Sequence, residues 1–109
     1  MAFDAGLAHR IRETAGDGPS MTERNMFGGL CFMYNGNMCL GIVGSDLMVR
    51  VGPDAYVDAL AAPHAREMDF NGRPMRGMVY VSPEGVADDA DLAAWIDRGV
   101  AFARSLPPK

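Results

Sequence analysis

Apolar residues and glycine dominate the stretch between residues 25 and 51, which two short polar breaks divide. Asn35-Gly36 is typical of a hairpin turn, because a type I′ turn needs positive φ at both central positions. Gly44-Ser45 suits a type II′ turn, which takes glycine at its first central position. The pattern therefore predicts three consecutive antiparallel strands joined by tight turns.

Two-residue loops would also fix the register, so that Met33 faces Met38, Phe32 faces Cys39, and Gly41 faces Met48. Successive side chains of a strand point to opposite faces, so this register sorts the stretch into two sets. The continuously apolar set is expected to face the core: Phe27, Cys31, Met33, Met38, Leu40, Ile42, Leu47, Val49 and Val51. The other set mixes apolar residues with glycine and charge: Met26, Gly28, Leu30, Phe32, Tyr34, Cys39, Gly41, Met48 and Arg50.

Helical periodicity occurs in three other segments. Residues 2–15 place an apolar side chain every four positions, a shorter stripe follows Pro53 and is expected to end at Pro63, and residues 88–106 carry the longest stripe. Asp88 suits the N-cap of this last helix. Its stripe is expected to lie on the sheet with Trp95 buried, and consists of Leu92, Trp95, Ile96, Gly99, Val100, Ala103 and Leu106.

Two further strands are expected at residues 66–70 and 75–81, with a turn at Asn71-Gly72. In the later strand, Arg76, Met78 and Tyr80 share a face. The element order is then α-β-β-β-α-β-β-α. It predicts one α+β domain over residues 1–109, with a five-stranded antiparallel sheet and helices mainly on one face, in two layers.

Composition and charge narrow the class of protein. The apolar fraction of 49% and charged fraction of 22% are those of an ordinary globular domain. No apolar run approaches the roughly 20 residues of a membrane helix, and the N-terminus has no signal-peptide pattern, so we expect a cytoplasmic protein that does not associate with membranes. The net charge of −4 disfavours nonspecific binding to nucleic acid.

The sequence contains little catalytic chemistry. The common nucleotide-binding, serine-hydrolase and metalloprotease motifs do not occur. His9, His64, Cys31 and Cys39 lack the spacing of a zinc site, and the two cysteines are expected on opposite faces as reduced, packed thiols. We therefore expect a non-enzymatic protein without a metal or other cofactor.

The candidate interaction residues lie on the outward faces of the predicted strands. Methionine is common at adaptable binding surfaces, and aromatic residues and arginine are typical of interface cores. An apolar patch of this size is rarely left bare, so we expect a homodimer or another protein partner to cover it, unless one helix crosses to this face. The residues are Met26, Leu30, Phe32, Tyr34, Met48, Arg50, Arg76, Met78 and Tyr80.

Two alternative functions remain open. The first is a nucleic-acid-associated module that uses Arg24, Arg50, Arg73 and Arg76, although solvated salt bridges also explain these residues. The second is a small ligand-binding protein or enzyme with a pocket that no motif reveals.

Several motifs together resemble a known family. They are Met26-Phe27-Gly28-Gly29-Leu30, Asn35-Gly36-Asn37-Met38, Asp46-Leu47-Met48-Val49-Arg50-Val51, Gly72-Arg73-Pro74-Met75, Ala93-Ala94-Trp95 and Ser105-Leu106-Pro107. Over nearly its whole length the chain is similar to the TfoX N-terminal domain family. The resemblance implies an α+β fold with an antiparallel sheet. It also implies a stand-alone bacterial domain related to regulators of natural competence, a family that supplies no agreed catalytic residues.

Overall fold

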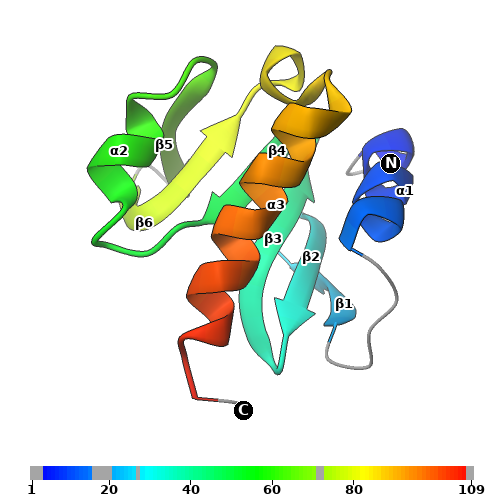
Figure 1. The fold of residues 1–109 in the computed structure, drawn as a ribbon, viewed down its shortest axis with the longest axis horizontal. Coiled ribbons are helices and arrows are strands. Elements are labelled where there is room, and N and C mark those ends of the chain that lie inside the picture. Colours follow the sequence, from blue (N-terminus) through cyan, green and yellow to red (C-terminus); the bar gives the residue numbers. More distant parts are fainter. Residues whose placement is uncertain (1–3, 16–20, 27, 71–72, 108–109) are drawn as a thin grey trace.

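The computed structural model describes residues 4–15, 21–26, 28–70 and 73–107, which form one antiparallel sheet of six strands with three α-helices (Figure 1). In chain order the elements are α1 (Ala5–Ala15), β1 (Met21–Met26), β2 (Gly29–Tyr34), β3 (Asn37–Val43), β4 (Asp46–Arg50), α2 (Tyr56–Leu60), β5 (Ala65–Phe70), β6 (Arg73–Val81), the 3₁₀ helix η1 (Pro83–Val86) and α3 (Asp89–Arg104). The α+β class and the antiparallel sheet are confirmed.

The sheet runs in the order β1-β2-β3-β4-β6-β5, so β6 lies between β4 and the edge strand β5. The predicted number of five strands is wrong because the chain reverses between Met26 and Gly29. Met26 pairs with Gly29, and Gly28 takes a φ of 74°. Gly29 passes so close to the carbonyl of Ile42 that a side chain there would overlap it. The predicted first strand is thus a hairpin of two strands.

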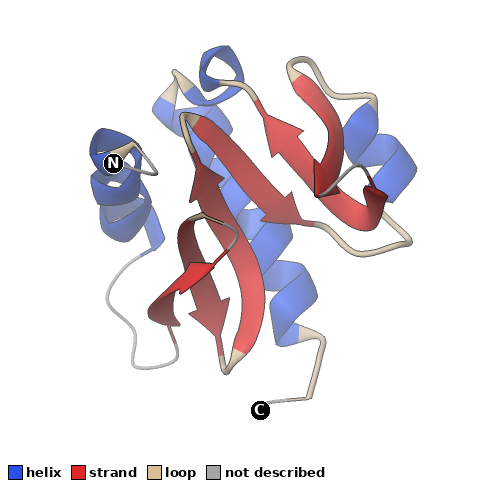
Figure 2. Ribbon diagram, turned by 180° about the vertical axis from the view of Figure 1, so that it is seen from behind, coloured by secondary structure: helices blue, strands red, loops and turns tan. Residues whose placement is uncertain are grey.

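All three helices cover the same face of the sheet, as predicted (Figure 1, Figure 2). The longest, α3, lies across β3 and β4, and α1 packs beside it. Trp95 of α3 is 6% exposed, which confirms its predicted burial. The core between the helices and the sheet also includes Leu7, Ile11, Leu40, Ile42, Leu47, Val49, Val79, Val81, Leu92 and Ile96.

The second helix is shorter than predicted. It begins at Tyr56, because Pro53 and its neighbours form a turn, and it ends at Leu60. Ala59 is buried, whereas Val57 is 70% exposed. The N-cap of α3 is Asp88, as predicted, but its side chain makes no capping hydrogen bond.

A β-bulge changes the predicted register between β2 and β3. The turn pairs Tyr34 with Asn37 and Met33 with Met38 as expected, but Phe32 then pairs with Leu40 instead of Cys39. One extra residue in β3 therefore opposes β2. The predicted pairing of Gly41 with Met48 across β3 and β4 is confirmed.

This shift of one residue turns β2 over, because side chains alternate with a period of two. Leu30 and Phe32 pack in the core under the helices, at 6% and 1% exposure, and Tyr34 packs against that core. Cys31 and Met33 point to the opposite face. The bulged residue Cys39 joins the helix-side core next to Leu40, while Met38 lies on the opposite face. The face predicted for each of these residues except Leu40 is therefore wrong.

Candidate interaction face and arginine pocket

Figure 2 views the side of the sheet away from the helices, here called the open face. This face carries a cluster of methionines. Cys31, Met48, Met68 and Met78 form a small core there, each 6% exposed or less. Gly41 makes room for it, because a side chain at residue 41 would overlap the Met48 methyl group. Five of the methionines whose side chains the structure describes lie on this face, since Met33 and Met38 pack against the cluster together with Tyr80.

The structure divides the predicted interaction residues between the two faces. Met48, Met78 and Tyr80 lie on the open face. Leu30, Phe32 and Tyr34 lie on the helix-covered face, so the expected patch loses three of its large side chains. The side chains of Met26 and Arg76 lie outside the described part of the structure.

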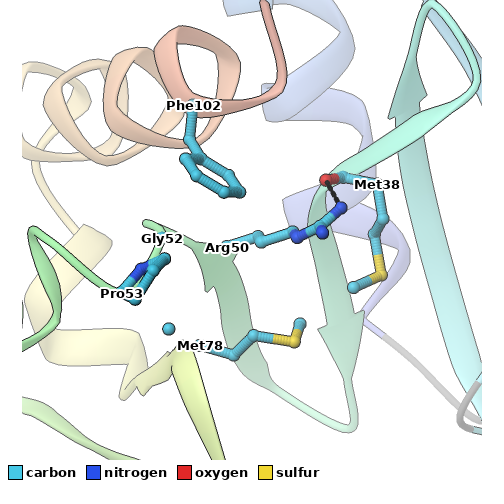
Figure 3. Close-up of a pocket in the computed structure, with 7 residues that line it drawn as sticks. Met38, Arg50, Gly52, Pro53, Met78 and Phe102 are labelled. Atoms are coloured by element: carbon cyan, nitrogen blue, oxygen red, sulfur yellow. Dashed lines mark hydrogen bonds between the residues drawn. The ribbon is translucent and has the colours of Figure 1, made fainter. Parts of the chain in front are cut away.

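Arg50 lies at one end of the open face, in a pocket of about 370 Å³. Figure 3 shows its side chain extending between the Phe102 ring and Met78 toward Met38. These groups come from β4, α3, β6 and β3, so the pocket forms only when the sheet and the last helix assemble. The described lining consists of Met38, Arg50, Gly52, Pro53, Gly77, Met78 and Phe102.

The Arg50 guanidinium is fixed by two contacts. Its carbon lies 5.2 Å from the centroid of the Phe102 ring, within the range of a cation–π interaction. Its Nη1 donates a long hydrogen bond of 3.4 Å to the carbonyl oxygen of Met38. Arg50 forms no salt bridge with a carboxylate among the described residues.

Two glycines shape this end of the sheet. Gly52 and Gly77 have φ angles of 87° and 93°, which glycine adopts without strain. The amides of Val51 and Gly52 both donate to the carbonyl of Gly77, at 2.8 and 3.0 Å, and the chain leaves the sheet there. A side chain at residue 52 would overlap the Phe102 ring, so the ring packs directly on the Gly52 backbone.

Arg24 is the one other arginine of the predicted nucleic-acid patch whose side chain the structure describes, and it does not lie beside Arg50. Arg24 is exposed on β1, three strands from β4, or about 14 Å at the usual strand spacing. Arg73 and Arg76 lie on β6, and their side chains are outside the described part. Arg66, a further arginine of the same segment, forms a salt bridge with Asp46 and lies 5.0 Å from the Tyr80 ring centroid.

A second pocket, of about 360 Å³, lies where the chain enters β5 and meets α3. Its described lining includes His64, whose φ of 67° is unusual for a residue with a side chain, and Arg98, which stacks on Trp95. Among the residues that the structure describes, no three His, Cys, Asp or Glu side chains are grouped so that they could hold a metal ion.

Both cysteines are free and buried. Burial raises the pKa of Cys31 to about 11 and that of Cys39 to about 12, so both are thiols at neutral pH. They lie on opposite faces of the sheet, as predicted, although each is on the face assigned to the other. Cys39 Sγ donates a hydrogen bond to the carbonyl of Phe32 at 3.3 Å.

Sequence reasoning missed the main partner of Arg50. Phe102 lies off the apolar stripe of α3 that contains Val100 and Ala103, and it is half-buried. A large aromatic residue on the polar side of a helix was the available signal. Met38 and Met33 were missed because the bulge in β3 cannot be read from alternation.

Within the described residues, no helix has the length and apolar character needed to span a membrane. Comparisons with curated proteins and with solved structures gave no significant match. A comparison with family models matched residues 14–103 to the TfoX N-terminal domain, which covers β1–β6, α2 and nearly all of α3. The chain therefore belongs to the TfoX N-terminal domain family.

Proposed function

We propose that this chain is a non-enzymatic regulatory domain that binds another protein through the open face of its sheet. The observation that carries the proposal is the placement of α1, α2 and α3 on one face (Figure 2). In the described structure the other face carries methionines, Cys31 and Tyr80, with Arg50 beside Met78 and Arg66 over the Tyr80 ring. Met33, Met38 and Tyr80 are half-buried there. Flexible, polarizable methionines suit a surface that adapts to its partner.

The chemistry of the two cysteines supports a binding function. A cysteine nucleophile reacts as the thiolate, and burial keeps Cys31 and Cys39 protonated at neutral pH. The sequence also lacks the common catalytic motifs. We therefore infer that the exposed side chains of the domain bind a partner and do not catalyse a reaction.

We propose a second copy of this chain as the first partner to test. The open face lacks Leu30 and Phe32, and its central methionines are already buried within one chain. Among the described residues, the one large apolar side chain that is highly exposed is Val57, on α2. A permanent dimer buries a larger apolar surface than the open face leaves exposed. We therefore expect weak, concentration-dependent association about a twofold axis.

The nucleic-acid alternative receives less support from the geometry. A net charge of −4 opposes approach to a polyanion, and the exposed Arg24 is separated from Arg50 by β2 and β3. If duplex DNA is the partner, binding at low salt should weaken steeply as salt increases, and Arg50→Ala should reduce it. No binding at low salt would eliminate this alternative for the isolated chain.

The methionines provide the test of the proposed function. With ¹³C-methyl-methionine labelling, the Met33 and Met38 signals should shift or broaden as protein concentration increases, whereas Met21, which packs on the helix side, should not. Light scattering on the same samples would measure the increase in mass. If the measured mass remains that of a monomer, cytoplasmic extract is added and the Met33 and Met38 signals are followed again to detect another partner.

Tyr80→Glu on the open face should abolish these changes, and Val57→Glu on α2 is the matched control that should preserve them. Equal changes at Met21, or changes that survive Tyr80→Glu in a folded protein, would refute the open face as the binding surface. The absence of any change with the concentrated protein and with extract would refute the interaction function.

A further inference from the structure

The pocket at Arg50 combines a cation, an aromatic ring and thioether side chains. Its volume of about 370 Å³ falls near the lower end of ligand pockets, which span roughly 300–1,000 Å³. Arg50 is the one charged side chain in its described lining. We propose that this pocket binds a small organic monocarboxylate with a flat apolar body, a ligand site that adjoins the proposed protein contact at Met38.

The hydrogen bonding of Arg50 favours a carboxylate. Nη1 is directed to the Met38 carbonyl, and within the described structure Nε and Nη2 donate to no protein acceptor. The Nε–Nη2 edge of a guanidinium presents two parallel N–H donors, which match the two oxygens of a carboxylate. Because Arg50 has no carboxylate partner among the described residues, a ligand would not have to displace one from them.

The Phe102 ring positions this edge. Its centroid lies 5.2 Å from the guanidinium carbon, and the ring itself rests on the Gly52 backbone. A side chain at residue 52 would displace the ring, so the glycine and the aromatic residue form one unit. An arginine held in this way loses less freedom when a ligand binds.

The rest of the pocket accommodates an apolar body. The side chains of Met38 and Met78 lie near Arg50 in Figure 3, and Pro53 lines the side below Phe102. Thioether sulfur makes favourable contacts with aromatic rings, and an unbranched methionine adapts to the shape of a flat ligand. An aromatic or similarly planar carboxylate fits this lining.

The described lining suits one negative charge better than two. The amides of Val51 and Gly52 already donate to the carbonyl of Gly77, so they are not directed at a ligand. A phosphate would bring close to two charges to a single described cation in an apolar pocket, and desolvating the uncompensated charge is costly. The single positive charge of Arg50 therefore favours a monocarboxylate over a phosphate.

The test uses 2-naphthoate as the probe, with the neutral 2-naphthamide and inorganic phosphate as comparisons. Titration of the ¹³C-methyl-methionine protein at low concentration should give saturable shifts at Met38 and Met78, and none at Met21. Loss of the charge-assisted hydrogen bonds should make naphthamide bind about 10- to 100-fold more weakly than naphthoate. Phosphate should not compete.

Arg50→Gln should weaken naphthoate binding by about 10- to 100-fold while leaving naphthamide binding within about twofold of wild type. Arg98→Gln is the matched control, since Arg98 also stacks on an aromatic ring, that of Trp95, but lies in the other pocket. If Arg50→Gln does not fold, Arg50→Lys keeps the charge without the planar donor edge, and it should weaken naphthoate binding by about tenfold.

Three results would overturn the proposal: absence of naphthoate binding, equal affinity of wild type for naphthoate and naphthamide, or undiminished naphthoate binding by a folded Arg50 variant. None of them bears on the protein contact at the open face, because that contact is measured with Tyr80→Glu in the absence of ligand. Failure of the ligand site and failure of the proposed function are thus separate outcomes.

Discussion

Gly99 of α3 packs directly against the backbone carbonyl of Cys39, the extra residue of the bulge in β3. A Cβ atom at residue 99 would lie 2.5 Å from that oxygen and 2.9 Å from Leu40 Cδ2. The helix therefore packs tightly on the sheet where the strand is irregular. This contact links the position of α3 to the register of β3.

Gly99→Ala should destabilise the protein despite the better helix propensity of alanine. The methyl group must push α3 off the bulge, at an overpacking cost of about 1–3 kcal/mol, which exceeds the gain of about 1 kcal/mol in propensity. Urea denaturation followed by Trp95 fluorescence would measure the loss. Gly6→Ala in the exposed part of α1 is the control and should be neutral or slightly stabilising. Equal effects of the two substitutions would contradict the close packing.

Phe32→Ala and Met33→Ala should lower the stability of the protein by very different amounts, although the two residues are neighbours in the chain. Phe32 is 1% exposed beneath the helices, so its truncation should cost about 3–5 kcal/mol. Met33 is half-buried on the open face, and its truncation should cost about 1 kcal/mol. Denaturant unfolding would give both losses of stability from the shifts in midpoint, provided that the slope of free energy against denaturant is the same for both variants. The reverse order would show that β2 follows the unbulged register instead.

The Arg12–Glu23 pair should make stability depend on acidic pH. Arg12 donates two hydrogen bonds of 2.7 Å to the Glu23 carboxylate, and they hold the pKa of Glu23 below its ordinary value. Since a lowered pKa favours the folded state only while the carboxylate is ionised, the contribution is complete above about pH 5 and disappears as pH falls through the folded pKa.

Because both side chains are more than a third exposed, Glu23→Gln should cost only about 0.2–1 kcal/mol at neutral pH. The two proteins should become equally stable at strongly acidic pH, as measured by urea titrations from pH 7 downward. High salt should shrink the difference at pH 7. A difference that grows on acidification would mean that Glu23 is stabilised when protonated.

Cys31 and Cys39 should resist alkylation in the folded protein. Their pKa values of about 11 and 12 leave very little thiolate at pH 8, and both side chains have no measurable exposure. Relative to an ordinary cysteine of pKa about 8.5, the thiolate fraction alone should slow iodoacetamide labelling by more than about 100-fold. Labelling measured by mass spectrometry should become fast in urea. Rapid native labelling of either residue would show that its part of the sheet opens readily.

Local sequence alone determined most of the secondary structure. Asn35-Gly36 and Gly44-Ser45 lie at the two tight turns because their backbone preferences are intrinsic, and Gly41 pairs with Met48 as two-residue loops require. The stripe through Leu92, Trp95 and Ile96 likewise predicted which side of α3 is buried. Alternation on β6 placed Met78 and Tyr80 on the open face.

Only the tertiary structure decided which face of β2 is buried and where the arginine pocket forms. A bulge adds a single residue without altering the apolar pattern, so alternation could not reveal that Phe32 is in the core and Cys31 is not. The pocket depends on Phe102 lying against Gly52, residues that are far apart in the chain. Such contacts follow from how α3 packs on the irregular end of the sheet, and no local preference encodes that packing.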